Sequence, residues 1–276
     1  MAHCVVVEAE EILDKEFPVL DKGFIRLVDY LGSDERVVQA ARVSYGKGTK
    51  SSREDAGLID YLMRNRHTSP FEQVALTFHI KMPIFIARQW VRHRTARLNE
   101  ISGRYSVMKD DFYTPDIEDI TLQNSDNKQG RSDELLSRSE ADALRAGFEY
   151  AQRHAYGEYI KLIDRGIARE LARINLPLSL YTEMYWQIDL HNLFHFLELR
   201  LGAHAQKEIR MYARTLLEIC RKVAPVCCAS FERNVLGAVA FSSDEARELK
   251  RRLAGGGEGE SLLDEKSLAR FEDKLK

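Results

Sequence analysis

The chain has 276 residues, 44% of them hydrophobic and 30% charged, which excludes disordered, collagen-like and disulfide-stapled small proteins. Lysine and arginine number 41 against 43 aspartates and glutamates, so no overall basic excess favours DNA or an acidic membrane, and an anion site must be local. Apolar runs such as 82–87 are far shorter than the roughly 20 residues that cross a bilayer, and the acidic amino terminus is unlike a signal peptide. We expect a cytoplasmic protein with one catalytic domain, 1–240, and a charged tail, 241–276.

The amino-terminal part predicts strands and helices in alternation. Residues 75–82 alternate between apolar and polar side chains, as a half-buried strand does, and Pro83 then suits the first position of a helix. Ser52 followed by Asp55 is a capping-box start for a helix. The predicted elements of this part are strands at 4–7, 24–30 and 75–82 and helices at 34–44 and 52–63.

The carboxy-terminal part is mostly helical by its apolar spacing. A long helix is predicted from about residue 132 to Gly166, with one apolar stripe made of Leu144, Phe148, Ala151, Ala155, Tyr159 and Leu162. Further predicted elements are a helix at 168–176, a strand at 178–188 and helices at 190–201 and 203–223. The last of these has a buried face of Ile209, Ala213, Leu216, Leu217 and Cys220. Residues 243–276 are expected to form a helical or mobile tail.

The segment 88–104 holds a local excess of positive charge. It contains five arginines and one histidine but a single acid, Glu100. Arg88 and Arg92 are four residues apart and would share a helix face. Four residues that could bind a phosphate in a turn follow. They supply a side-chain amide, a hydroxyl, an approachable backbone and a bidentate cation, in the order Asn99, Ser102, Gly103 and Arg104. From residue types alone, a phosphate pocket, ion pairs with surface acids and a nucleic-acid patch all remain open.

No glycine-rich nucleotide loop competes with this segment. No GxGxxG motif follows a predicted strand. The stretch 46–51 lacks the spacing of a phosphate-cradling loop, because Ala41 and Lys50 are wrong for it. A Rossmann or P-loop mechanism is therefore not expected.

The order of residues in this segment is more informative than their types. Residues 92–106 read RHRTARLNEISGRYS and closely resemble RHRxxSxNExSxR, the signature of flavin-dependent thymidylate synthases. The resemblance covers roughly residues 23–235 and continues in the same order through 24–29, 40–44, 67–72, 82–90, 173–181 and 199–209. It implies an α+β fold with a central, mainly antiparallel sheet flanked by helices.

The resemblance also implies an activity. Members of that family are methyltransferases that make dTMP from dUMP, with 5,10-methylenetetrahydrofolate as carbon donor and with reducing equivalents from NADPH through bound FAD. The family further implies a homotetramer whose subunits share active sites. Neither a nucleic acid nor a membrane is an expected partner.

Matched positions assign residues to two ligands. Arg200 matches the arginine at the uracil, where a fixed cation favours ionisation of N3 and pushes electron density towards C5, so it is the expected catalytic residue. The expected dUMP-binding residues are Gln89, Arg92, Glu100, Ser102, Gly103, Arg104, Arg173 and Arg200. The expected FAD-binding residues are His67, Ser69, Glu72, Arg92, His93, Arg94, Glu100, Asp189, His191 and His195.

Three positions depart from the family pattern. Arg97 stands where the signature has serine, so that hydroxyl contact cannot be carried over. Asp189 and His191 occupy positions where many members have Asn and Arg, and flavin contacts there are expected to be rearranged or weaker. The resemblance implies no role for residues 1–20 and 241–276.

Two alternatives use other groupings of side chains. His191, His195 and Glu198 have the spacing of a metal site on a helix, and loss of activity on chelation would support it. A nucleic-acid-binding module built on 88–104 and Tyr105 would bind oligonucleotides in a salt-dependent way without flavin.

A third alternative is cysteine-dependent thymidylate synthesis. Cys227 or Cys228 would attack C6 of uracil, although neither has a histidine close by in the sequence. Turnover retained after replacement of all four cysteines would exclude this chemistry. The cysteines lack CxxC spacing and are expected to be reduced, mostly buried thiols: Cys4, Cys220, Cys227 and Cys228.

Overall fold

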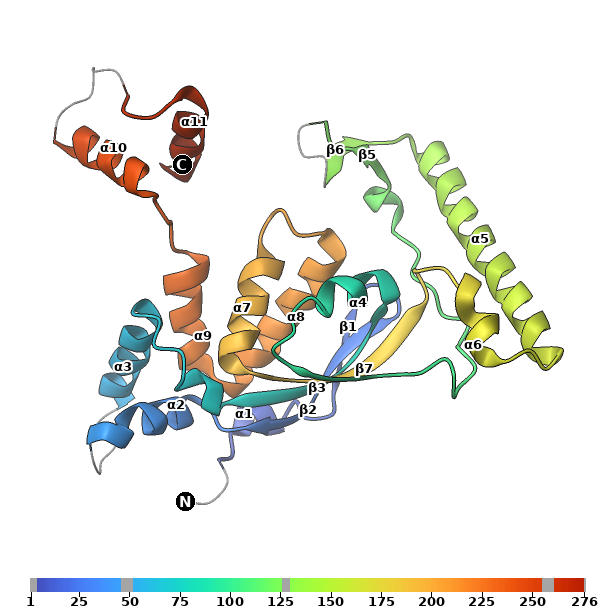
Figure 1. Ribbon diagram of the computed structural model, residues 1–276, viewed down its shortest axis with the longest axis horizontal. Helices are drawn as coiled ribbons and strands as arrows, with labels where there is room; N and C mark the ends of the chain where they lie inside the picture. Colours follow the sequence, from blue (N-terminus) through green and yellow to red (C-terminus); the bar gives the residue numbers. More distant parts are fainter. Residues whose placement is uncertain (1–3, 46–51, 126–129, 255–260, 276) are drawn as a thin grey trace. The chain divides into compact units, whose positions relative to one another are not determined.

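A computed structural model describes residues 4–45, 52–125, 130–254 and 261–275, and the chain divides into two compact units, 1–231 and 232–276 (Figure 1). The larger unit is built on a five-stranded sheet in the order β1-β2-β3-β7-β4, and every neighbouring pair is antiparallel. The strands are β1 (Glu16–Val19), β2 (Gly23–Leu31), β3 (Ala75–Pro83), β7 (Tyr181–Asp189) and β4 (Arg97–Glu100). With helices beside this sheet, the predicted α+β fold class is confirmed.

Alternation along β3 explains its place in the centre of the sheet. Leu76, Phe78, Ile80 and Met82 are fully buried on one face, while the side chains between them are only half-buried on the other. The predicted strand 75–82 is confirmed. Pro83 is the last residue of this strand and pairs with Tyr181. It is also the N-cap residue of the next helix, which begins at Ile84. The prediction that Pro83 occupies the first helical position is therefore wrong by one residue.

Three helices cover the buried face of the sheet (Figure 1). They are α4 (Ile84–Trp90), α7 (Leu190–Leu201) and α8 (Lys207–Val223). Trp90 of α4 packs against Trp186 of β7 and Phe196 of α7, with ring centroids 5.2 and 4.5 Å apart. The predicted bounds of α7 are confirmed, as is the buried face of α8, although α8 begins at Lys207 and residues 203–206 form a turn.

The first predicted strand, 4–7, is wrong. A helix, α1 (Val7–Glu10), begins within it, and β1 is the strand that pairs with β2. The backbone N–H of Val6 donates to the hydroxyl of Tyr30 at 2.8 Å, so a side chain takes the place that a neighbouring strand would fill. The helices predicted at 34–44 and 52–63 are confirmed as α2 (Asp34–Ala41), followed by the 3-10 turn Arg42–Tyr45, and α3 (Ser52–Arg64). The predicted Ser52 cap and the stretch 46–51 lie outside the described side chains.

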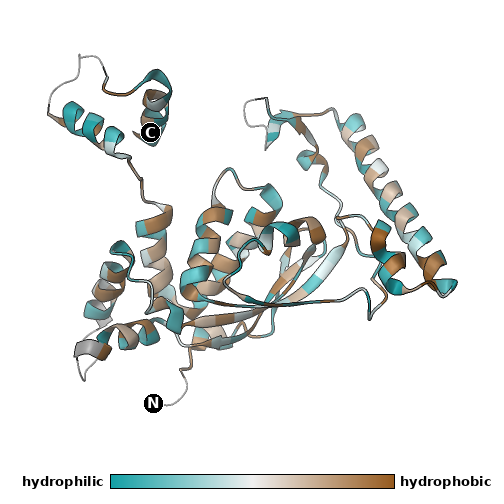
Figure 2. Cartoon of the chain, viewed as in Figure 1, coloured by the Kyte–Doolittle hydropathy of each residue, from teal (hydrophilic) through white to brown (hydrophobic). Residues whose placement is uncertain are grey.

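The long helix α5 (Arg138–Asp164) starts later than predicted. Residues 131–135 form the strand β6 (Arg131–Leu135), which pairs with β5 (Thr121–Gln123) in a separate two-stranded sheet. A capping box between Ser137 and Glu140 sets the start of the helix. The predicted apolar stripe is divided, because Tyr159 is buried whereas Leu144 and Phe148 are each 49% exposed. Figure 2 shows hydrophobic and hydrophilic residues mixed along this helix.

Several short helical segments also belong to the described part of the larger unit, among them two 3-10 turns, Phe71–Gln73 and Ile117–Asp119. The helix predicted at 168–176 is α6 (Arg169–Ala172), continued by a 3-10 turn, Arg173–Asn175. The helix α9 (Pro225–Phe231) follows α8 and was not predicted.

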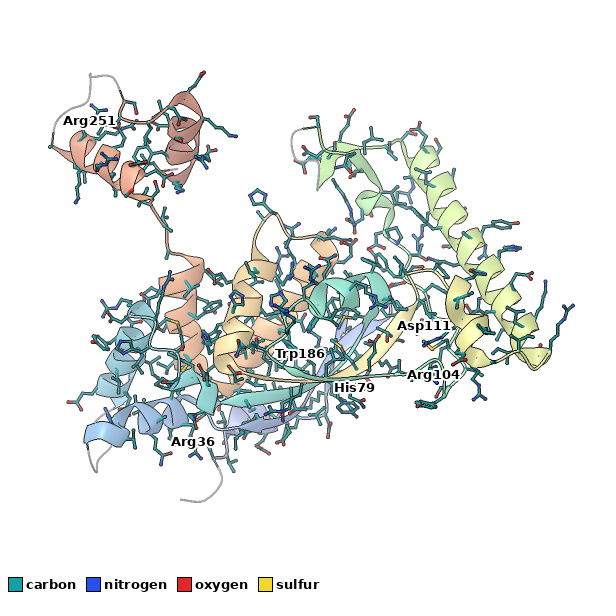
Figure 3. All side chains as sticks on the ribbon, in the orientation of Figure 1. Arg36, His79, Arg104, Asp111, Trp186 and Arg251 are labelled. Carbon is teal, nitrogen blue, oxygen red and sulfur yellow. The ribbon has the colours of Figure 1, made fainter. Side chains whose placement is uncertain are left out.

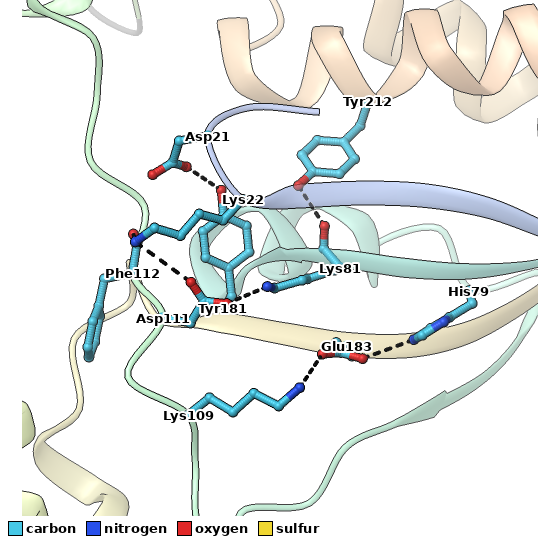
Figure 4. A network of polar contacts seen from close by, with 10 residues as sticks. All are labelled: Asp21, Lys22, His79, Lys81, Lys109, Asp111, Phe112, Tyr181, Glu183 and Tyr212. Atoms are coloured by element: carbon cyan, nitrogen blue, oxygen red, sulfur yellow. Dashed lines mark hydrogen bonds and ion pairs between the residues drawn. The ribbon is translucent and has the colours of Figure 1, made fainter. Parts of the chain in front are cut away.

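A network of charged groups fixes the segment 109–112 to the sheet (Figure 4). Lys81 of β3 forms an ion pair with Asp111. Lys22 donates to the backbone carbonyl of Phe112 at 2.8 Å, and its Nζ lies 3.7 Å from Asp111 Oδ1. The chain that follows the arginine-rich segment is therefore anchored within a few residues of it.

The smaller unit contains a π-helix, Glu232–Leu236, and two helices, α10 (Ser243–Leu253) and α11 (Glu265–Leu275), which confirm the helical part of the predicted tail. Phe271 is fully buried there, and the buried carboxylate of Glu248 pairs with Arg251 and Arg252. Residues 255–257 lie outside the described residues. Among the residues that the structure describes, no helix is long and apolar enough to span a bilayer.

Candidate active site

The structure places most of the predicted site residues in three parts of the larger unit. We call Gln89, Arg92, His93, His195 and Arg200 the Arg200 cluster, because they meet where the end of α4 faces α7. Ser102, Gly103, Arg104 and Arg173 form the Arg173 cluster beside α6. The His67 loop, residues 67–72, precedes β3. The roles predicted for these residues stay predictions.

Hydrogen bonds hold the guanidinium of Arg200 from two directions. Its Nε donates to Nε2 of His93 at 3.0 Å, and its Nη2 donates to the backbone carbonyl of Gln89 at 3.3 Å. The side-chain amide of Gln89 donates in turn to Oε1 of Gln206 at 2.5 Å. A cation with two of its donors already engaged keeps a fixed orientation for its remaining N–H groups.

Burial lowers the pKa of both His93 and Arg200. The pKa of His93 is lowered from 6.5 to about 4, first by burial and then by the charges of Arg200 and His195. Burial and the nearby charge of Arg92 lower the pKa of Arg200, which still leaves a guanidinium protonated in proteins. His93 is therefore neutral at physiological pH and able to accept the hydrogen bond from Arg200.

The lowered pKa of His93 predicts a pH dependence of stability. Between 6.5 and about 4 the unfolded chain binds a proton at this residue that the folded chain does not bind, so the free energy of unfolding falls as pH falls through that window. Urea unfolding at about pH 7 and about pH 5 measures the fall. We expect His93→Gln to show a smaller fall than the wild type, and an equal fall in both would contradict the assignment.

The Arg173 cluster depends on a glycine. A Cβ atom at Gly103 would lie 3.0 Å from Met108 Sδ and 3.1 Å from Arg173 Cδ, so the absence of a side chain lets Arg173 approach. Nε of Arg104 lies 3.3 Å from a carboxylate oxygen of Glu170. The backbone N–H of Arg104 donates to Oγ of Ser102 at 3.3 Å. This hydrogen bond shapes a turn in which polar side chains surround the backbone of Gly103.

The two arginine clusters are not joined within one chain. His93 precedes β4 and Ser102 follows it, and four strand residues span about 13 Å. Figures 1 and 3 show α7 over the middle of the sheet and Arg104 beside α6. Between the two clusters the described residues form no hydrogen bond or ion pair. Glu100, at the end of β4, instead accepts a hydrogen bond from Thr182 at 2.6 Å.

The His67 loop lies against the start of α7. Phe71, which is buried, packs against Phe194, and the backbone N–H of Leu190 donates to the carbonyl of Val74 at 2.8 Å. Within the loop, Thr68 donates to Glu72 at 3.4 Å. This packing brings the predicted flavin residues His67, Ser69 and Glu72 to the same end of the sheet as the beginning of α7.

Asp189 caps α7. One of its carboxylate oxygens accepts from the backbone N–H of Asn192 at 2.9 Å and the other from the side-chain amide of Asn192 at 2.7 Å. Both oxygens are thus engaged in starting the helix that carries His191 and His195. The rings of His195 and His93 have centroids 5.9 Å apart.

Arg97, the departure from the family serine, lies on the other face of the sheet. It is paired in register with Gln187, to which it donates at 3.2 Å, whereas the neighbouring Trp186 points into the core. Glu100 has the opposite parity along β4 and pairs with Met184 of the buried face. The long side chain of Arg97 is therefore directed away from the face on which α4 and α7 pack.

Most arginines of the segment 88–104 form no ion pair with an acid in the described part of the chain. Arg104 pairs with Glu170, but Arg88, Arg92 and Arg94 form no ion pair with any acid that the structure describes. The alternative in which surface acids balance these arginines is thus supported only at Arg104. Free guanidinium groups at one end of α4 suit a polyanionic ligand.

Gln206 is a site residue that the sequence did not reveal. It lies in the turn between α7 and α8, which the sequence assigned to a helix, and no motif singles it out. The structure places it against Gln89 and on the wall of a cavity of about 750 Å³ next to β5 and β6.

The cysteine and metal alternatives find no support. Cys220, Cys227 and Cys228 are reduced and buried, as predicted, and Cys4 is partly exposed. Burial and the nearby Asp34 raise the pKa of the Cys227 thiol well above its usual value, which opposes formation of a nucleophilic thiolate. Among the described residues, no three histidine, cysteine, aspartate or glutamate side chains gather to hold a metal ion.

Comparison with known proteins identifies the family. The sequence profile described as thymidylate synthase complementing protein matches residues 26–226. The chain belongs to this family. A flavin-dependent thymidylate synthase from Treponema denticola is 62% identical over 96% of this chain and 98% of its own length, and one from Treponema pallidum is 60% identical over 100% and 90%. The resemblance drawn from residues 92–106 is confirmed.

A solved relative shares the fold of the thymidylate synthase complementing proteins. The UMP/dUMP methylase PolB from Streptomyces cacaoi, crystallised with 5-Br dUMP, superposes with a TM-score of 0.71 at 35% identity, over 79% of this chain and 98% of its own. The smaller unit, 232–276, lies beyond the matched family profile.

Proposed function

We propose that this chain is a flavin-dependent thymidylate synthase, a methyltransferase that converts dUMP to dTMP. The carbon donor is 5,10-methylenetetrahydrofolate, and NADPH supplies reducing equivalents through bound FAD. The observation that carries the proposal is the Arg200 cluster, in which two hydrogen bonds orient a partly buried guanidinium in a chain of this family. A uracil nucleotide in the solved relative supports a nucleoside monophosphate as substrate. A cytoplasmic location stays a prediction from the sequence.

Methylation requires a uracil whose C5 becomes nucleophilic. A fixed cation beside the ring stabilises the anion formed when N3 loses its proton, and that anion carries more electron density at C5. Arg200 supplies the cation without a covalent bond to the ring. Because its guanidinium is partly buried, water screens its charge less than that of a surface arginine.

The residues of the Arg200 cluster and the His67 loop fit a flavin dinucleotide. FAD contains a diphosphate, and the guanidinium groups of Arg92 and Arg94, which pair with no acid among the described residues, are matched donors for it. The rings of His93 and His195 offer flat, hydrogen-bonding surfaces beside these cations. When bound, FAD would carry reducing equivalents from NADPH to the nucleotide. The chain would bind and orient the two ligands against each other.

A second copy of the chain would complete each site. Within one chain, β4 separates the Arg173 cluster, proposed to bind the dUMP phosphate, from the turn of His93 that contacts Arg200. Leu171, Ile174 and Leu178, which flank Arg173 in the sequence, are 58%, 70% and 60% exposed. Apolar side chains exposed together in this way are typical of a surface that a partner covers. A homotetramer with shared sites brings the Arg173 cluster of one subunit to the Arg200 cluster of another.

The visible absorption spectrum of the purified chain tests this function first. We expect an oxidised-flavin band that survives desalting after reconstitution with FAD and that shifts when dUMP is added, because both ligands would occupy one site. Formation of dTMP from dUMP, the folate and NADPH is then the decisive assay. No flavin retained after reconstitution would overturn the proposal, and salt-dependent oligonucleotide binding would then favour the nucleic-acid alternative.

Arg173→Ala is expected to weaken dUMP binding and leave the flavin in place. Loss of one charged donor to a phosphate lowers affinity by on the order of 10- to 100-fold. Calorimetric titration of the flavin-loaded protein with dUMP measures this change. The control is Arg153→Ala, at an exposed arginine of α5 that pairs with Glu149 at 3.6 Å, and its dUMP affinity should equal that of the wild type. Equal dUMP affinity in the Arg173 variant and the wild type would place Arg173 outside the phosphate site.

A further inference from the structure

The contact between Arg200 and His93 joins two distant parts of the sequence. Arg200 lies in the last turn of α7, and His93 follows α4 in a turn closed by the hydrogen bond from its own N–H to the carbonyl of Trp90 at 3.0 Å. The ring of His93 packs edge-on against Phe196, with centroids 4.7 Å apart. The imidazole is thus held by its backbone and by an apolar wall, and its Nε2 points at Nε of Arg200.

The direction of this hydrogen bond fixes the form of the imidazole. A guanidinium has donors only, so Nε2 of His93 must accept and the ring proton must lie on Nδ1. Among the described residues, the groups shown to face the ring are Arg200, His195 and Phe196, and none of them is an acid that would favour a charged imidazolium. A neutral ring with its proton on Nδ1 is the form that this site selects.

We propose that His93 is a positioning residue for Arg200, holding the guanidinium plane so that its outer N–H groups face the pyrimidine. This inference rests on the proposed function and gives His93 a role besides the flavin contact that the sequence resemblance implies. Of the five guanidinium N–H groups, His93 takes the one on Nε and the carbonyl of Gln89 takes one on Nη2. Three N–H groups remain for a ligand. Restricting the rotamers of the arginine before substrate arrives removes an ordering cost from the reaction.

Two substitutions separate the acceptor at Nε2 from the rest of the ring. His93→Gln places an amide oxygen near the position of Nε2, whereas His93→Asn reaches only as far as Nδ1. We expect His93→Asn to lower turnover by on the order of 10- to 100-fold, because a hydrogen bond to a charged group is lost. We expect His93→Gln to restore part of that loss. His154→Asn, at a histidine exposed on α5, is the control for a change of residue type alone.

Nitrogen NMR of the ligand-free protein tests the geometry without any turnover. In protein labelled with nitrogen-15 in its histidine rings, the His93 signal is identified by its loss in His93→Gln. We expect the Nδ1–H form in the wild type and a shift towards the Nε2–H form in Arg200→Ala. An Nε2–H ring in the wild type would overturn the proposal.

The two measurements keep this inference apart from the proposed function. If the wild type makes no dTMP, the proposed function fails, and the positioning role for this reaction falls with it, while the ring tautomer still reports whether the contact exists. If the wild type is active but His93→Gln and His93→Asn are equally impaired with equal flavin content, an acceptor at Nε2 is not what matters. Only recovery in the glutamine variant, together with the Nδ1–H ring, supports positioning.

Discussion

Arg200→Ala is expected to abolish most turnover while the flavin remains bound. Removal of a preorganised group that stabilises developing negative charge typically lowers turnover by about 100- to 1,000-fold. The flavin is expected to stay, because the hydrogen bonds of Arg200 are with His93 and Gln89, whereas the proposed diphosphate donors Arg92 and Arg94 and the His67 loop are left in place. The measurements are the rate of dTMP formation at saturating dUMP and the flavin absorbance retained after desalting.

Arg200→Lys provides the matched comparison for this prediction. Lysine keeps the positive charge but cannot donate to His93 and Gln89 in the planar arrangement of a guanidinium. We expect a rate between those of the alanine variant and the wild type. A rate equal to that of the wild type in Arg200→Ala would remove this residue from the chemistry.

Gly23→Ala is expected to destabilise the larger unit more than any surface substitution. A Cβ atom at this position would lie 2.0 Å from the hydroxyl oxygen of Tyr212 and under 3 Å from the backbone carbonyls of Val19 and Lys81. Tyr212 is buried and donates to that carbonyl of Lys81 at 2.7 Å, so it cannot move without losing a buried hydrogen bond. We expect the free energy of unfolding to fall by about 3 kcal/mol or more.

Gly147→Ala is the control for this change. Gly147 lies inside α5 with no atom near its would-be Cβ, so alanine there should raise helix stability by about 0.5–1 kcal/mol. Urea unfolding of both variants gives the comparison. A similar unfolding midpoint for the two would mean that the backbone at Gly23 adapts easily.

The sequence predicts those parts of the fold in which one strong periodic pattern decides the structure. The strand 75–82 and the helix 190–201 follow from regular apolar spacing, since each buries one face against the same core. The predicted strand at 4–7 is wrong because four apolar residues do not specify a neighbouring strand. The hydroxyl of Tyr30 instead accepts a hydrogen bond from the backbone N–H of Val6. The strands β5 and β6 were missed because they are short, polar and mostly exposed.

The candidate site was likewise predicted only in part from the sequence. The order of residues in 92–106 identifies the family, but no sequence pattern predicts that Arg200 and His93 meet across 107 positions of the chain. Gln206 carries no motif and becomes visible only because the turn before α8 places it against Gln89. Spacing also says nothing about the distance between Arg200 and Arg173, since that depends on how α6 and α7 are placed on the sheet.

The position of β4 between the two arginine clusters has a consequence for mixed assemblies. If each site takes its Arg200 cluster from one subunit and its Arg173 cluster from another, a chain damaged at Arg200 still contributes an intact phosphate half, and a chain damaged at Arg173 an intact uracil half. Co-assembly of the two defective chains would then recreate about one wild-type site in four by random association. Two variants that are each inactive alone would therefore regain activity when they assemble together.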